Sequence, residues 1–463
     1  MQLTSPLFLF LFLPLSLLPL PLCPPRYRKG ALTLLSLLWF LFVNRTAPLS
    51  LLQIGGVVLF VCLLAILPDR APRLRLALGV SLPLAALVAA RVIAEYHLLP
   101  YTYPTGLTMV VLGAISIAID RYRGDAPEQE NPLSVLCYLL FAPAMLVGPV
   151  LRYKQFLNAT EQIKPSLAGF ATGAKLFMCG YIKRVALAAV LLRAIGEVLD
   201  ISAQAAPLFA LLVLFLIAFA LLYSFVTGCT DMARGLMAMY GIKPPRTKAT
   251  QTALLLPHNV LYSMHLTLYR YFEDYVAAPI KQRVRGRFGK VLAALSLALL
   301  TLLFYRTRLS SLLFAIPLLL TALLFACRPP HLRAPRHPLV RFLLSIFAFL
   351  SLSIFALGLL LPNPAQIFSL FARASIRRTP YAIFYLLSAI SDSRYLALAL
   401  ALMMLFPLFH LLHRLSHKWP QKPVFFLECV GTLLLFAAFF LTLVYYLPQF
   451  PNLADPIYGT FPL

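Results

Sequence analysis

The segment Tyr262–Ile280 concentrates side chains that can do acid–base chemistry. It reads YSMHLTLYRYFEDYVAAPI and places His265 and the neighbouring Glu273 and Asp274 between long apolar runs. An imidazole can take up and return a proton near neutral pH, and a carboxylate can orient its ring. Because ionisable groups at the edge of a membrane region are costly to keep there, they are candidates for function. We therefore take His265 as the candidate base, oriented by Asp274 or Asp231.

A second chemical feature lies where an apolar stretch is interrupted at Phe141–Tyr153. Two prolines and Gly148 disfavour a continuous helix there, and broken backbone at membrane depth must be covered by protein or line a wet cavity. Arg152 and Tyr153 follow directly, so they are candidates for holding the phosphate or thioester of a donor molecule. The alternative is that Arg152 anchors a cytoplasmic loop at the membrane surface.

The stretch Tyr223–Asp231 allows two interpretations. Its sequence YSFVTGCTD could form non-helical backbone that makes Asp231 part of a pocket wall. Alternatively, its small residues Ser224, Thr227 and Gly228 could let two helices pack closely, as membrane helices often do. The sequence alone leaves both open.

The remaining histidines are weaker candidates. His258 lies seven residues before His265 and is either a second group near the candidate base or, more commonly, a loop residue. His410, His413 and His417 would share one face of a helix and could bind a metal or supply a base. We favour an interfacial helix for these three, since no carboxylate lies nearby in sequence to orient a ligand histidine. The seven cysteines form no CxxC pair, so the sequence predicts neither a metal site nor a disulfide framework.

These residues must be positioned by a membrane-embedded helical domain. Of 463 residues, 61% are hydrophobic and 12% are charged, and the mean hydropathy is +0.85, whereas soluble domains carry about 25% charged residues. We predict one all-α integral membrane domain over residues 1–463, with roughly 11–13 helices. The first expected membrane helix is Leu3–Leu22, and the later apolar segments are 31–43, 50–67, 76–95, 105–119, 133–150, 168–199, 208–226, 228–241, 289–305, 309–327, 342–361, 381–409 and 425–447.

The net charge of +25 has a membrane explanation. Forty Lys and Arg face 15 Asp and Glu, a balance that in a soluble protein would suggest nucleic acid. Here the basic residues gather in loops, where they fix cytoplasmic orientation and meet anionic lipid. We therefore expect the lipid bilayer as a partner and no nucleic acid. The candidate cytoplasmic loops are Arg70–Arg75, Lys243–Lys248, Lys281–Lys290 and Arg328–Arg341.

Six segments with recognisable motifs occur in order along nearly the whole chain. They are SPLFLFLFLP with PPRYRK (Ser5–Lys29), IDRYRGD (Ile119–Asp125), GPVLRYKQF (Gly148–Phe156), SFVTGCTDMARGLMAMYGI (Ser224–Ile242), MHLTLYRYFEDYVAAPI (Met264–Ile280) and DPIYGTFPL (Asp455–Leu463). Together these segments resemble the membrane-bound O-acyltransferase superfamily, and within it they are most similar to the branch that contains alginate O-acetyltransferases and teichoic-acid D-alanylation proteins.

The resemblance implies a ring of tilted helices around a central cavity or funnel, in the bacterial cytoplasmic membrane. It also implies an acyl group passing from a cytoplasmic donor such as acetyl-CoA through a tunnel lined by His265. The acceptor would be an exported polysaccharide, with a separate extracytoplasmic acyltransferase as partner and no permanently bound cofactor.

The chain departs from the family at a second histidine, which should fall within Leu300–Leu309. The sequence there is LTLLFYRTRL, and Arg306 lies near the expected position. Arginine stays protonated and cannot act as a base, although it can stabilise an oxyanion or hold a phosphate. Two hypotheses follow: an O-acyltransferase that works with His265 alone, or a non-catalytic scaffold in an envelope-modification or export complex.

Overall fold

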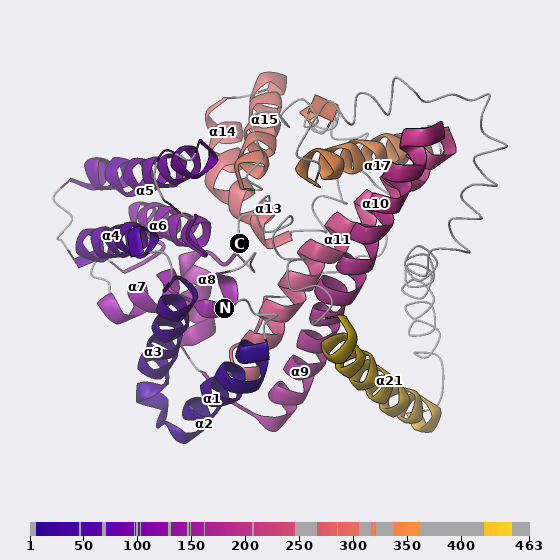
Figure 1. The fold of residues 1–463 in the computed structure, drawn as a ribbon. Helices are drawn as coiled ribbons and strands as arrows, with labels where there is room; N and C mark the ends of the chain where they lie inside the picture. Colours follow the sequence, from indigo (N-terminus) through magenta and orange to yellow (C-terminus); the bar gives the residue numbers. More distant parts are fainter. Residues whose placement is uncertain are drawn as a thin grey trace.

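The computed structural model describes residues 6–45, 48–66, 71–96, 98, 101, 103–127, 131–145, 148, 150–161, 163–205, 208–245, 266–284, 286–304, 316–317, 319–320, 338–360 and 421–446. Helices dominate these ranges, and no strand occurs within them (Figure 1). The prediction of an all-α protein is confirmed.

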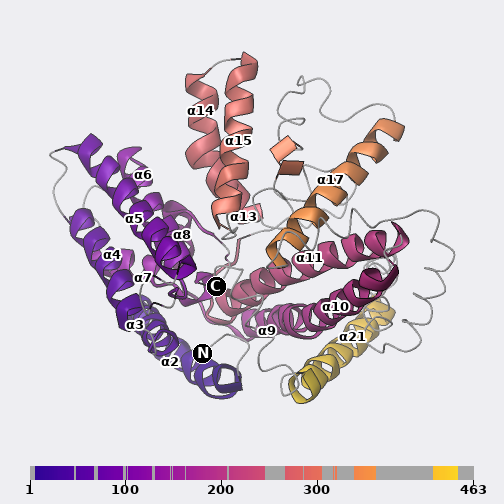
Figure 2. The ribbon, with the colours of Figure 1, turned by 45° about the horizontal axis from the view of Figure 1, so that its top comes forward.

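The helices form an N-terminal group, a long hairpin and a set of later helices (Figures 1 and 2). The N-terminal group comprises η1 (Phe8–Phe12), α1 (Leu13–Leu17), α2 (Pro19–Leu22), α3 (Pro25–Val43), α4 (Pro48–Ile66), α5 (Pro72–Glu95), α6 (Leu107–Tyr122), α7 (Pro132–Leu139), η2 (Ala142–Ala144) and α8 (Tyr153–Thr160). The hairpin comprises α9 (Leu167–Ile182), η3 (Lys183–Leu187), α10 (Ala188–Ala205) and α11 (Leu208–Met239). The later elements are α13 (Leu266–Phe272), η5 (Glu273–Ala277), α14 (Ala278–Arg283), α15 (Gly286–Phe304), α17 (Pro338–Leu360), α21 (Gln421–Leu441) and η9 (Thr442–Tyr446).

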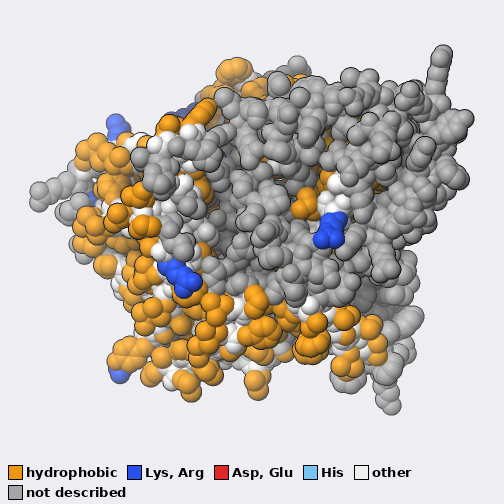
Figure 3. Space-filling model, in the orientation of Figure 1, with side chains coloured by type: hydrophobic (Ala, Val, Ile, Leu, Met, Phe, Trp, Pro, Cys, Tyr) orange, Lys and Arg blue, Asp and Glu red, His pale blue; other side chains and the backbone are white. Residues whose placement is uncertain are grey.

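Three described helices are long and apolar enough to cross a membrane by themselves. They are Pro48–Ile66, Pro72–Ala94 and Leu211–Met239. Large apolar side chains such as Phe10, Leu52 and Leu59 are more than half exposed, and Figure 3 shows hydrophobic side chains over much of the described surface. Side chains of this kind are stable facing lipid, so the chain is an integral membrane protein. The total number of spans stays a prediction, because segments 309–327 and 381–409 fall mainly outside the described residues.

The α9–α11 hairpin corrects one prediction. The sequence lists 208–226 and 228–241 as separate apolar segments and allows non-helical backbone over Tyr223–Asp231, but α11 runs as one helix from Leu208 to Met239. The hydroxyl groups of Ser224 and Thr227 bond to carbonyls one turn earlier, so they do not interrupt the helix. The alternative, close helix packing through small residues, is confirmed.

Two pairs of glycines bring the backbones of α9 and α11 into contact. A Cβ atom added at Gly180 would lie 2.6 Å from the Gly228 carbonyl oxygen, and one at Gly173 would lie 2.6 Å from that of Gly235. The pairing of earlier residues in α9 with later residues in α11 makes the helices antiparallel. Only glycine permits this approach, which is how small residues drive helix association in membranes.

The predicted break at Phe141–Tyr153 is confirmed. Helix α7 ends at Leu139, and among the described residues before α8 starts at Tyr153 the one helical element is the short η2. Side chains from other helices take up the released backbone groups: Ala142 N donates to Ser36 Oγ (3.3 Å), and Val150 N donates to Thr267 Oγ1 (3.2 Å). Non-helical backbone at membrane depth requires such partners. A small pocket of about 30 Å³ lies beside this segment, and its lining is mostly apolar.

Candidate functional site

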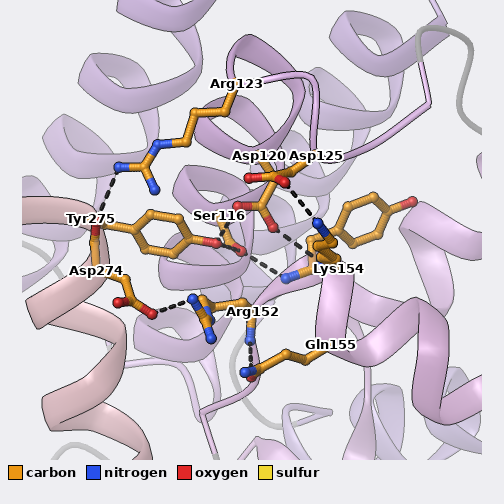
Figure 4. Close-up of polar contacts among 10 residues, drawn as sticks. Ser116, Asp120, Arg123, Asp125, Arg152, Lys154, Gln155, Asp274 and Tyr275 are labelled. Carbon is orange, nitrogen blue, oxygen red and sulfur yellow. Dashed lines mark hydrogen bonds and ion pairs between the residues drawn. The ribbon is translucent and has the colours of Figure 1, made fainter.

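Three of the segments that carried the family resemblance converge at one polar cluster (Figure 4). Helix α6 contributes Ser116 and Asp120, and the turn after α6 contributes Arg123 and Asp125. The start of α8 contributes Arg152, Tyr153 and Lys154, and η5 contributes Asp274 and Tyr275. We call these nine residues the polar cluster.

A buried hydrogen-bond chain forms the centre of the polar cluster. Tyr275 Oη donates to Asp120 Oδ1 at 2.6 Å and lies 2.8 Å from Ser116 Oγ. A tyrosine has one hydroxyl proton, and an ionised Asp120 can only accept, so Ser116 must donate to Tyr275. Ser116 and Asp120 are almost completely buried, at 0% and 3% exposure. The order Ser116 → Tyr275 → Asp120 therefore satisfies each buried hydroxyl group.

The same two side chains of α6 cap the beginning of α8. Tyr153 N donates to Ser116 Oγ at 2.8 Å, and Lys154 N donates to Asp120 Oδ2 at 3.1 Å. The first N–H groups of a helix lack intrahelical partners, and a negative charge near them is favourable. Asp120 thus serves as a cap supplied by a distant helix, and it fixes α8 against α6.

The rim of the polar cluster is charged and more accessible. Arg152 forms an ion pair with Asp274, and both side chains are about a third exposed. Arg123 Nη2 donates to the Asp274 carbonyl at 3.0 Å, with its guanidinium 5.3 Å from the centre of the Tyr275 ring. Lys154 Nζ lies 2.7 Å from Asp125 Oδ1, and this hydrogen bond lowers the pKa of Asp125. Pairs as exposed as these contribute little to stability.

A π-helical turn places both Asp274 and Tyr275 on the polar cluster. Pro279 has no N–H group, so it cannot donate to the Tyr275 carbonyl as a residue in an ordinary α-helix would. The Ala278 N–H instead reaches back to the Glu273 carbonyl, five residues earlier, and so closes the wider π turn. Single π turns within helices are frequent at functional sites.

Helix α13, which leads into this turn, is fixed by three contacts to other elements. Tyr271 Oη donates to the Leu112 carbonyl at 2.6 Å, and the Thr267 hydroxyl accepts from Val150 N. Tyr275 supplies the third contact through Asp120. These contacts hold α13 against α6 and the broken segment.

The candidate residues fall into three groups. Arg152, Tyr153 and Asp274 meet in the polar cluster, although the Tyr153 ring is fully buried with its centre 5.1 Å from that of Tyr138. Asp231 lies elsewhere, in the α9–α11 hairpin, where it pairs with Lys183. His265, His258 and Arg306, together with the other six histidines, lie outside the described residues, so their roles stay predictions.

The two neighbouring carboxylates of η5 have different partners. Glu273 Oε1 lies 4.0 Å from Lys281 Nζ. Asp274 pairs with Arg152, a residue more than one hundred positions earlier in the chain.

Sequence reasoning did not single out Ser116, Asp120, Asp125, Lys154 or Tyr275. Asp120 had a detectable signal, since it directly follows the apolar segment 105–119 and lies within the segment IDRYRGD. A carboxylate at the end of an apolar run is costly unless it has partners, and this one has two donors. Among the described residues, no group of three or more His, Cys, Asp or Glu side chains could hold a metal ion.

Comparison with known proteins finds similarity over part of the chain. Three curated relatives carry the name probable alginate O-acetylase AlgI. The protein from Azotobacter vinelandii is 29% identical over 214 residues, which is 41% of this chain and 42% of the relative. The protein from Pseudomonas putida is 30% identical over 210 residues (41% and 43%), and that from Pseudomonas aeruginosa is 28% identical over 210 residues (41% and 40%).

These similarities support membership of the membrane-bound O-acyltransferase superfamily. The match covers about two fifths of the length of these relatives, and no family model matches the chain. The polar cluster joins three of the six segments that resemble this superfamily.

Proposed function

We propose that this membrane-bound O-acyltransferase family member passes an acetyl group from a cytoplasmic donor across the membrane for O-acylation of an exported polysaccharide. The similarity to probable alginate O-acetylases supports the substrate class. The observation that carries the proposal is the convergence of three family-like segments on Asp120, through Tyr275 and the backbone of Lys154.

The polar cluster lies at the end of the protein that we propose faces the cytoplasm. Arg121 Nη1 donates to the Ala65 carbonyl at 2.6 Å, so the C-terminal ends of α6 and α4 meet there. Helix α5 begins shortly after α4 ends, which brings Arg73 and Arg75 to the same end. Basic residues in short loops favour the cytoplasmic side, where a donor such as acetyl-CoA would be available.

In the proposed reaction, a thioester C–S bond breaks and an ester C–O bond forms. His265 takes the proton of the attacking hydroxyl and returns it to the leaving thiolate, a role that imidazole fills well near neutral pH. Arg306 would stabilise the oxyanion or hold a donor phosphate. Arg152, a third exposed, would hold a donor phosphate by exchanging it for the Asp274 carboxylate.

We further propose that His265 acts within a rigid frame and that an extracytoplasmic protein completes the transfer. Leu266, which follows His265 in the sequence, is the first described residue of α13, and this helix is fixed by Thr267, Tyr271 and Tyr275. Catalysis by positioning requires rigid support of this kind close to the reacting groups. The location we propose is the cytoplasmic membrane of a bacterium.

A second candidate is a catalytically inactive scaffold of an envelope-modification complex. The observation that favours it is the Tyr305-Arg306 pair where the family places its second histidine. An arginine cannot serve as a base there.

The deciding experiment measures acetyl transfer by the full chain in lipid, together with the proteins encoded beside it. Radiolabelled acetyl-CoA is supplied, and label on protein or polymer is counted for the wild type, His265→Ala and Arg306→His. The proposal expects transfer by the wild type and loss of transfer in His265→Ala. If the wild type is inactive while an active family member works in the same assay, the scaffold function replaces the acetyl-transfer proposal. Transfer restored by Arg306→His would then show that the missing second histidine is the cause of the inactivity.

A further inference from the structure

A second charged group lies in the α9–α11 hairpin, apart from the polar cluster. Lys183 Nζ lies 2.7 Å from Asp231 Oδ2, and Arg234 Nη1 lies 3.5 Å from Asp231 Oδ1. The side chains of Lys183, Asp231 and Arg234 are 13%, 15% and 20% exposed, respectively. Two cations therefore share one carboxylate in a largely buried environment.

Arg234 is the incompletely satisfied member of this group. Its contact with Asp231 lies at the outer limit of hydrogen bonding, and its buried Nε has no hydrogen-bond partner among the described residues. A guanidinium has five N–H donors, and a buried charge needs close partners to offset its lost hydration. The geometry leaves donors of Arg234 available for another acceptor.

The fold holds these cations at a fixed place near one end of α11. Asp231 and Arg234 are three residues apart and so lie on one face of the helix, while Lys183 begins the π-helical turn η3 opposite them. The Gly180–Gly228 contact lies one turn away and fixes the two backbones. Arg234 lies five residues before the end of α11, a distance of about 8 Å along the axis.

The length of α11 bears on where this charged group lies relative to a membrane. Helix α11 has 32 residues and is about 48 Å long, whereas the hydrocarbon core of a bilayer is about 30 Å thick. A helix of this length tilts or extends into the headgroup layer at one end or both, and a charged group near its end is compatible with a headgroup position. The last turns of α11 meet the chain just before α9, where Lys164 N donates to the Gly241 carbonyl at 3.0 Å.

We infer that Lys183 and Arg234 bind a phosphate group, which competes with the Asp231 carboxylate for both cations. An ammonium and a planar guanidinium on one side of a phosphate are a strong charge-assisted arrangement. A bound phosphate would match the second positive charge and supply acceptors for Arg234. The phosphate belongs either to a phospholipid headgroup or to a soluble phosphate ester. This inference does not depend on acyl transfer.

Binding to the purified full chain in neutral detergent tests the inference and separates the two sources. One arm titrates phosphatidylglycerol, with diacylglycerol as its phosphate-free match, and the other titrates inorganic phosphate and coenzyme A. Saturable binding of phosphatidylglycerol alone identifies a lipid headgroup, whereas saturable binding of inorganic phosphate or coenzyme A identifies a soluble phosphate. Binding of neither overturns the inference.

Two substitutions of opposite expected sign locate the site. Arg234→Gln should weaken binding about tenfold or more, whereas Asp231→Asn should strengthen it, because the competing carboxylate charge is gone. Arg193→Gln, an exposed position in the same hairpin, should leave binding unchanged. Equal affinity in Arg234→Gln, or weaker binding in a folded Asp231→Asn, would show that the group only joins the helices. If Arg234→Gln does not fold, Arg234→Lys is used and should bind more weakly than the wild type.

Discussion

Tyr275 and Asp120 form a 2.6 Å hydrogen bond across 155 residues of sequence, and this bond joins η5 to the buried end of α6. Asp120 also accepts from the first turn of α8, so one carboxylate connects three separate parts of the chain. Substitutions at this junction should therefore affect stability more than substitutions at the accessible rim.

Replacing Tyr275 with phenylalanine should destabilise the protein by about 1–3 kcal/mol, because the buried Asp120 and Ser116 each lose a partner. The measurement is the thermal unfolding midpoint in detergent. Tyr122→Phe is the matched control, since that side chain is 48% exposed, and its midpoint should stay near that of the wild type. Equal midpoints for the two variants would contradict the proposed importance of the Tyr275–Asp120 bond.

Asp120→Asn should destabilise the protein by about 1–3 kcal/mol, whereas Asp125→Asn should change stability by less than about 1 kcal/mol. Asp120 is buried with two donors, while Asp125 pairs with Lys154 at the exposed rim. Denaturant unfolding monitored by circular dichroism compares the two. A larger loss from Asp125→Asn would mean that the rim, and not the buried chain, holds the elements together.

The Lys154–Asp125 pair should make a small contribution that disappears in acid. The pKa of Asp125 is lower in the folded protein than in the unfolded chain, because Lys154 donates a hydrogen bond to it. Ionised Asp125 therefore stabilises the fold at pH values above its unfolded-state pKa. This stabilisation is lost as the pH falls through the lower folded-state pKa. The stability difference between wild type and Lys154→Met should therefore be larger at pH 7 than well below pH 4. A stability difference between the two proteins that grows in acid would contradict the stabilising role of the Lys154–Asp125 pair.

Gly228→Ala should destabilise the hairpin by about 1–3 kcal/mol, because the new methyl group would lie 2.9 Å from the Gly180 carbonyl oxygen. Gly196→Ala is the control within the same hairpin: nothing lies within 4 Å of its added Cβ atom, and alanine favours a helix by about 1 kcal/mol. Thermal unfolding should move in opposite directions for the two variants. A shift in the same direction would argue against close contact of α9 and α11.

If Arg152 holds the donor, Arg152→Gln should raise the KM for acetyl-CoA about tenfold with a smaller change in kcat, as expected when a charge-assisted contact is lost. Asp274→Asn should lower the KM, since it removes the carboxylate that competes for Arg152. Glu161→Gln is the control, because that exposed carboxylate follows α8 and lies outside the polar cluster. An unchanged KM in Arg152→Gln would show that Arg152 does not hold the donor and only forms the structural ion pair with Asp274.

The sequence by itself determined the class of protein and much of its local structure. Apolar composition requires a membrane helical fold, and prolines with Gly148 predicted the break after α7, because these residues act on their own backbone.

Only the tertiary structure decided which distant groups meet. The small residues of Tyr223–Asp231 are compatible with a broken helix or with close packing, and the glycines of α9 decide for packing. Likewise, nothing in the periodicity near Tyr275 identifies Asp120 or Ser116 as its partners. A buried polar group can be satisfied by any donor or acceptor that the fold brings within reach, so the choice depends on long-range packing.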